Sequence, residues 1–131
     1  MVDVQAKVLD YIENAGIGFT RGTNLFGPEI GPNNQIPVNA LFSTTTGGPE
    51  PFRTMRSNEL RSPIINFMLR WSSYGEGRSK AIEVMNTLQG AEISGLLFVA
   101  LTESEPDYVT RTEDGNHKWS FGVSVDYNQD A

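Results

Sequence analysis

Apolar residues repeat at helical spacing at the start of the chain. Val4, Val8 and Ile12 follow one another at intervals of four positions, while acidic and amide side chains lie off this stripe. Gly16 comes next, and glycine suits the left-handed backbone that ends many helices. The pattern predicts an amphipathic helix that Asp3 caps at its N-terminus.

The middle of the chain predicts a strand followed by a second helix. Ile65, Phe67 and Leu69 alternate with other residues over 64–73, as one face of a strand does. Apolar residues at helical spacing over about 77–89 predict a helix, and Gly90 follows where a helix would end.

The segment Gly75-Glu76-Gly77 stands between the predicted strand and helix, which superficially resembles a phosphate-binding turn. The third glycine and the Lys-Ser/Thr pair of such turns are missing, and Glu76 would repel phosphate. We therefore interpret the segment as a flexible junction.

The last third of the chain is predicted to be β-structure. Residues 96–101 form an unbroken apolar run, which is typical of an interior strand. Strands over 108–112 and 118–127 flank Asp114-Gly115, and Asp-Gly between two such runs favours a hairpin. One face of the last strand is apolar throughout: Trp119, Phe121, Val123, Val125 and Tyr127.

Residues 16–63 differ from the rest because they hold six of the seven prolines and seven of the thirteen glycines. Proline lacks a backbone N–H, so only short strands are expected, over about 18–26 and 37–45. Residues 46–62 are predicted to form a long polar loop. Loops of this length are often functional, so we expect subunit contacts there.

Together these elements predict one α+β domain over residues 1–131. Two amphipathic helices must cover the apolar face of a mostly antiparallel, mixed sheet of about five or six strands, which ends in a long C-terminal hairpin.

Composition narrows the class of protein. The 131 residues are 38 % hydrophobic and 20 % charged, which is typical of a folded domain. The absence of cysteine excludes disulfides, thiolate catalysis and sulfur-ligated zinc, and leaves the redox compartment open. No secretory signal is visible, and the longest apolar run, over 95–101, is shorter than the roughly 20 residues that span a bilayer. We expect a soluble protein made in the cytoplasm.

The net charge of −6 argues against a dedicated nucleic-acid binder, whose affinity comes from clustered Lys and Arg. It is compatible with a protein that DNA merely passes, because a negative wall repels phosphates.

Candidate chemistry is sparse. His117 is the only histidine, and it is expected to be a surface residue beside the hairpin, with Asp114 across the turn. No Gly-x-Ser-x-Gly elbow is present to carry a nucleophile, so we predict no catalytic residues and no enzyme. Five carboxylates within twelve residues are of the kind that calcium prefers, but their spacing matches no metal-binding loop, so no metal or cofactor is predicted: Glu103, Glu105, Asp107, Glu113 and Asp114.

One basic cluster stands out, formed by Arg53, Arg56 and Arg61. These side chains are either solvated or paired with acidic groups across an interface, where the rigid donor fork of arginine is favoured. We hypothesise that Glu113 and Asp114 of a neighbouring copy are their partners.

The order of short motifs resembles the tail terminator and minor capsid (head–tail connector) proteins of long-tailed bacteriophages. The motifs are Asn24-Leu25-Phe26, Gly47 to Pro51, Pro63 to Arg70, Leu88-Gln89-Gly90 and Asp114-Gly115-Asn116. The resemblance implies a structural virion protein at the head–tail junction. It also implies a homo-oligomeric ring, a hexamer in the family, that caps the tail tube, joins it to the head connector and lets DNA pass through its lumen.

Other readings of the sequence remain open. The chain is alternatively a head-closure or connector subunit of the same neck. A ligand-binding module or enzyme would need a pocket beneath residues 46–62, with Asn66 and Arg70 as its polar groups. A third alternative is an inhibitor or adaptor that acts as a monomer.

Overall fold

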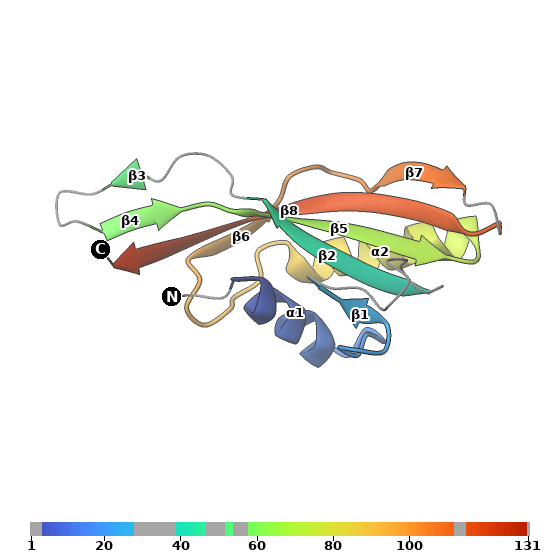
Figure 1. Cartoon of the computed structure of the whole chain (residues 1–131), viewed down its shortest axis with the longest axis horizontal. Helices are drawn as coiled ribbons and strands as arrows, with labels where there is room; N and C mark the ends of the chain where they lie inside the picture. Colours follow the sequence, from blue (N-terminus) through green and yellow to red (C-terminus); the bar gives the residue numbers. More distant parts are fainter. Residues whose placement is uncertain (1–3, 28–38, 47–51, 54–57, 112–114, 131) are drawn as a thin grey trace.

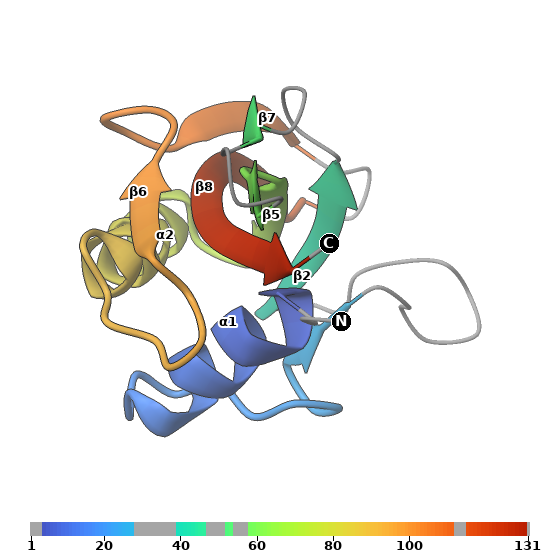
Figure 2. The same cartoon turned by 90° about the vertical axis from the view of Figure 1, so that its left-hand side faces the viewer.

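The fold is an elongated, twisted sheet with two helices on one face (Figures 1 and 2). The computed structural model describes residues 4–27, 39–46, 52–53, 58–111 and 115–130. Within these residues the helices are α1 (Val4–Asn14) and α2 (Tyr74–Leu88). Neither helix is long and apolar enough to cross a membrane. The described strands are β1 (Leu25–Phe26), β2 (Ala40–Thr46), β3 (Phe52–Arg53), β4 (Asn58–Arg61), β5 (Ile64–Trp71), β6 (Phe98–Leu101), β7 (Asp107–Arg111) and β8 (His117–Asp130).

The long strand β8 organises the sheet because other strands pair with it along both sides. On one side, β5 pairs with residues 117–124 and β4 with residues 127–130, both antiparallel. On the other side, β7 and β6 pair with the first and the middle part of β8. Beyond β5 lies β2, which is antiparallel to it, followed by the short parallel strand β1, and β3 lies beyond β4. The predicted α+β class, with two helices on a mixed, mostly antiparallel sheet and a long C-terminal hairpin, is confirmed.

The described part of the sheet has eight strands because the segment predicted as a long loop contributes two of them. The prediction of a loop over 46–62 is wrong where β3 and β4 form. β4 and β5 keep one register against β8 on either side of Pro63, with Arg61 opposite Tyr127. Pro63 has no N–H to donate, but its carbonyl accepts the N–H of Val125 at 3.0 Å. The proline therefore removes one donor from the ladder and does not end it.

The core lies between the two helices and the inner face of the sheet. Every second residue of β5 and β8 points into it, as the alternation in the sequence predicts. The helices contribute the apolar stripes that were predicted for them, and glycines with positive φ follow both at Gly16 (74°) and Gly90 (68°). Asp3, the predicted cap of α1, lies outside the described residues. The buried side chains of the core include Val8, Leu9, Ile12, Leu41, Ile65, Phe67, Leu69, Ala81, Val84, Met85, Leu88, Trp119, Phe121, Val123 and Val125.

The strand predicted over 18–26 is wrong except for β1. Asn24 closes a turn in this segment: its side-chain amide donates to the carbonyl of Gly18 at 2.8 Å and accepts the N–H of Thr20 at 2.7 Å. Gly18 and Gly22 have positive φ angles of 94° and 85°, which an extended strand does not permit. Asparagine and glycine at these positions favour turns over strands.

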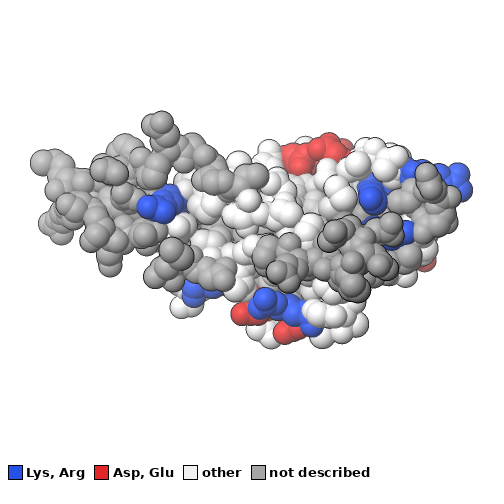
Figure 3. Space-filling view, in the orientation of Figure 1, with Lys and Arg blue, Asp and Glu red and all other residues white. Residues whose placement is uncertain are grey.

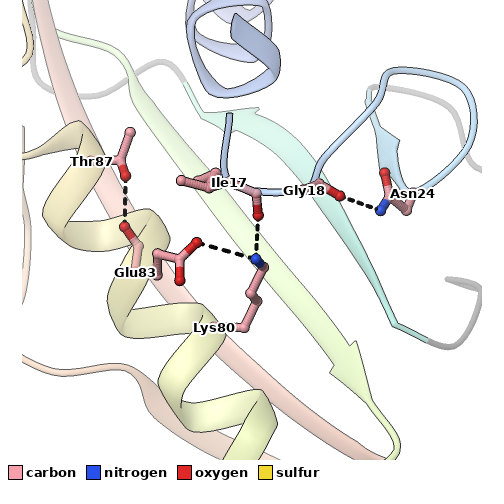
Figure 4. Close-up of polar contacts among 6 residues, drawn as sticks. All are labelled: Ile17, Gly18, Asn24, Lys80, Glu83 and Thr87. Atoms are coloured by element: carbon pink, nitrogen blue, oxygen red, sulfur yellow. Dashed lines mark hydrogen bonds and ion pairs between the residues drawn. The ribbon is translucent and has the colours of Figure 1, made fainter. Parts of the chain in front are cut away.

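This turn is fastened to α2 by Lys80 (Figure 4). The Lys80 ammonium donates to the carbonyl of Ile17, lies 3.2 Å from the carboxylate of Glu83 and stands 5.3 Å from the centre of the Phe19 ring. The contact joins the end of α1 to the exposed side of α2 and holds the segment between α1 and β1 in place.

Helix α2 begins at Tyr74, a few residues earlier than predicted. Ser73 caps it, because its hydroxyl accepts the N–H of Glu76 at 3.4 Å, and Glu76 lies in the first turn at the positive end of the helix. Gly75-Glu76-Gly77 therefore lies inside the helix, and the interpretation of this segment as a flexible junction is wrong. The serine cap was the signal in the sequence that would have placed the start correctly.

The prediction of an interior strand over 96–101 is also wrong. β6 covers only Phe98–Leu101 and lies at the edge of the sheet, where Phe98 is 55 % exposed and Leu97 just before it is 59 % exposed. The end of α2 covers the outer side of β6. The N–H of Gly90 donates to the carbonyl of Val99 at 3.0 Å, and the Gln89 side chain accepts the N–H of Leu101 at 3.1 Å.

Candidate subunit interface

The basic and acidic groups predicted to meet in an interface come from opposite ends of β8. Arg61, half-buried at the end of β4, lies opposite Tyr127, whereas Arg111 and Gly115 on the flanks of the hairpin turn lie beside His117. The ten positions between these ends of β8 span about 33 Å. Arg61 and the hairpin therefore do not meet within one copy, and a contact between them requires a second copy.

The other residues of this hypothesis are less fully placed. The backbone of Arg53 lies in β3, opposite Glu59 of β4. Arg56, Glu113 and Asp114 lie outside the described residues. The structure thus brings the strands of Arg53 and Arg61 together and leaves the proposed ion pairs as a prediction.

One end of the molecule is a ribbon of three strands. β3, β4 and the last residues of β8 pair with one another and extend past both helices (Figure 1). Elsewhere the helices cover the inner face of the sheet and form the core. Because a narrow ribbon is weakly stable by itself, the ribbon is a natural place for another protein surface to bind.

The opposite end carries a cluster of aromatic rings. Tyr74 from the first turn of α2 packs against Tyr108 of β7 and Trp119 of β8, with ring centres 5.2 and 4.9 Å apart. His117 joins them, and its Nδ1 lies 2.9 Å from the Tyr108 hydroxyl. The expected surface histidine beside the hairpin is thus half-buried and bonded to a tyrosine of the facing strand.

Three of these side chains form an apolar surface that we call the aromatic patch: Tyr74, Tyr108 and Val109. They are 50 %, 41 % and 46 % exposed. Sequence reasoning missed the patch because aromatic residues at strand positions are normally taken as core. The short length of β7, all of whose residues are exposed, was the signal against that assumption.

Leu97 and Phe98 form the second exposed apolar surface. They border a half-open pocket of about 480 Å³ in the connection between α2 and β6, which we call the loop pocket. Its lining runs from Gly90 to Phe98 and includes the exposed carboxylate of Glu92. The Lys7 ammonium of α1 donates to the carbonyl of Ser94 at 3.0 Å and fastens this connection to the rest of the fold.

The pocket proposed beneath residues 46–62 has a different setting. Asn66 and Arg70 lie on the face of β5 that is turned away from the helices, because the residues between them point into the core. Arg70 is 9 % exposed and lies between Ala40 and Lys118 on the neighbouring strands. Both residues thus belong to a polar face of the sheet, and their part in binding a ligand stays a prediction.

The predicted carboxylate group divides into two pairs. Glu105 forms an ion pair with Arg78 at 3.6 Å. Glu103 and Asp107 form a hydrogen bond with each other, and burial followed by this contact raises the pKa of Glu103 to about 7, against a smaller lowering by the backbone of Gly122. Among the described residues, no three acidic or histidine side chains are grouped so that they could hold a metal ion.

The raised pKa of Glu103 predicts a pH effect on stability. Between about pH 4.5 and 7 the folded chain holds a proton on Glu103 that the unfolded chain releases. The stabilisation is therefore complete below pH 4.5 and is lost as the pH rises through 7. Between pH 5 and pH 8, the free energy of unfolding should fall further for the wild-type chain than for Glu103→Gln. Urea titrations of both proteins at both pH values measure this, and equal changes would contradict it.

The geometry therefore offers surfaces for protein contacts and gives no constellation of catalytic groups within the described residues. The sequence resemblance to phage tail proteins is the only pointer to a family. No protein-family model matches the chain, and no curated protein matches it at a significant level.

Proposed function

We propose that this chain is a structural subunit of a tailed bacteriophage that forms a ring at the head–tail junction and acts as the tail terminator. The observation that carries the proposal is the two-ended shape of the sheet. The ribbon of β3, β4 and β8 extends past the helices at one end, and an exposed aromatic patch lies at the other. A closed ring needs two different complementary surfaces on each subunit, and the two ends supply them.

The proposed ring binds the tail tube protein on one side and the head-closure or connector protein on the other. The net charge of −6 supports a role in which DNA passes through the lumen without being held, because acidic walls repel phosphate groups. The chain acts in the virion in this proposal and needs neither a cofactor nor a metal.

The proposal predicts that the purified protein assembles, or assembles when it is offered tail tubes, into rings with about six times the 14.5 kDa mass of the chain. Native mass spectrometry and negative-stain microscopy measure this. The double variant Arg56→Glu, Arg61→Glu should stay folded and lose assembly, because the basic cluster would then repel Glu113 and Asp114 of the next copy.

The matched control for the arginine variant reverses the acidic side. Glu113→Lys with Asp114→Lys should restore assembly when it is combined with the arginine reversals, and should prevent assembly alone. Unchanged assembly in the arginine variant would contradict the ion pairing. Particles of monomer mass, with and without tail tubes, would contradict the ring.

A further inference from the structure

Exposed large apolar side chains gather in two groups on the described surface. The aromatic patch at β7 and the first turn of α2 contains three of them, and Leu97 and Phe98 at the loop pocket are the other two. A soluble monomer exposes such side chains singly, whereas groups of them mark interaction sites. Each group therefore needs a partner surface.

The two groups differ in shape. The aromatic patch consists of rings stacked on rings, with Trp119 buried beneath Tyr74 and Tyr108, so it presents a filled surface. The loop pocket is a hollow of about 480 Å³ beside two exposed apolar side chains. A filled patch and a hollow complement each other, which two copies of either surface do not.

The two groups lie along the same edge of the sheet. Tyr108 is opposite Trp119 of β8, and Phe98 is opposite Asp126. Seven positions along a strand correspond to about 23 Å. One copy can therefore contact a different neighbour through each surface at the same time.

The charges around the two groups are also complementary. Arg111 follows the aromatic patch on β7, and basic side chains gather at that end of the molecule (Figure 3). The lining of the loop pocket includes the carboxylate of Glu92. An arginine beside the filled surface and a glutamate in the hollow favour the same pairing as the shapes do.

We propose that the aromatic patch of one copy docks into the loop pocket of the next copy of this chain. The inference rests on the proposed self-association, and it specifies which surfaces meet. The contact is made by side chains and not by strand addition at β6, because Gly90 and Gln89 already bind the outward groups of Val99 and Leu101. Since the two surfaces differ, the contact is head to tail and can continue around a ring.

Cysteine cross-linking tests this pairing, because the chain has no cysteine of its own. Val109→Cys and Leu97→Cys change exposed side chains in the patch and at the pocket. The two variants are produced together with tags of different length and treated with a short bis-maleimide reagent. We expect a cross-linked dimer that contains both tags, and at least tenfold less of either dimer that contains one tag twice.

A matched control replaces Leu97→Cys by Asn86→Cys, because Asn86 is exposed on α2 outside both surfaces. It should give no mixed dimer with Val109→Cys. A second test reverses charge: Arg111→Glu and Glu92→Arg should each reduce the mixed dimer, and the two together should restore it.

The outcomes separate this inference from the proposed ring. Assembled protein without the mixed dimer, or with mainly Val109–Val109 cross-links, would overturn the docking and leave the ring standing. A mixed dimer in open chains would support the docking and contradict the ring. Protein that stays monomeric without any cross-link would overturn both.

Discussion

Replacing Phe121 by alanine should lower the free energy of unfolding by about 3–5 kcal/mol, the range for losing a buried aromatic side chain. Phe121 is 2 % exposed at the middle of β8. It lies opposite Phe67 of β5, and the two rings stack with centres 5.2 Å apart. Alanine would leave a cavity where both helices and the two central strands meet. Urea unfolding followed by circular dichroism measures the change.

Phe98→Ala is the matched control, because it removes the same side chain from a position that is 55 % exposed. This variant should change the free energy of unfolding by less than about 0.5 kcal/mol. Similar losses for both variants would contradict the placement of Phe121 in the core and of Phe98 at the edge.

Replacing Gly77 by alanine should destabilise the fold by about 1–3 kcal/mol, even though alanine is the better helix former. A Cβ at Gly77 would lie 2.8 Å from the Cβ of Trp71 and 3.1 Å from Nε1 of Trp119. Both contacts are too close, and Trp71 Cβ is fixed to its backbone. Helix α2 would have to move away from β5 and β8, and its packing would be lost.

Gly75 provides the control within the same helix turn. A Cβ there would meet nothing within 4 Å, so Gly75→Ala should leave stability unchanged or raise it by up to about 1 kcal/mol. The same thermal or urea unfolding experiment compares the two variants. If Gly77→Ala proved as stable as Gly75→Ala, the close approach of α2 to the sheet would be wrong.

Side-chain periodicity predicted the elements that build the core. Both helices and the strands β5 and β8 carry regular apolar stripes, and each forms within a few residues of its predicted place. Between these elements the sequence was a poorer guide. Prolines and polar residues over 46–62 predicted a loop, but backbone pairing with β8 forms β4 there because a ladder tolerates one missing donor.

The candidate surfaces were harder to predict than the core. An apolar run such as residues 96–101 looks the same in an interior strand and in an edge strand, because only the partner strands distinguish them. The hollow beside Leu97 and the stack of Tyr74 on Tyr108 join residues that are distant in the sequence. The charged residues Arg53, Arg56, Arg61, Glu113 and Asp114 were found from sequence, and their pairing stays a prediction.

The most direct test of the proposed function locates the chain in an assembled particle. Gold-conjugated antibody against this chain is applied to tailed particles that contain it, which are then viewed by negative-stain microscopy. The proposal predicts one gold label at the head–tail junction of each intact particle. Particles without label at that junction, with the chain found only in the soluble fraction, would contradict it.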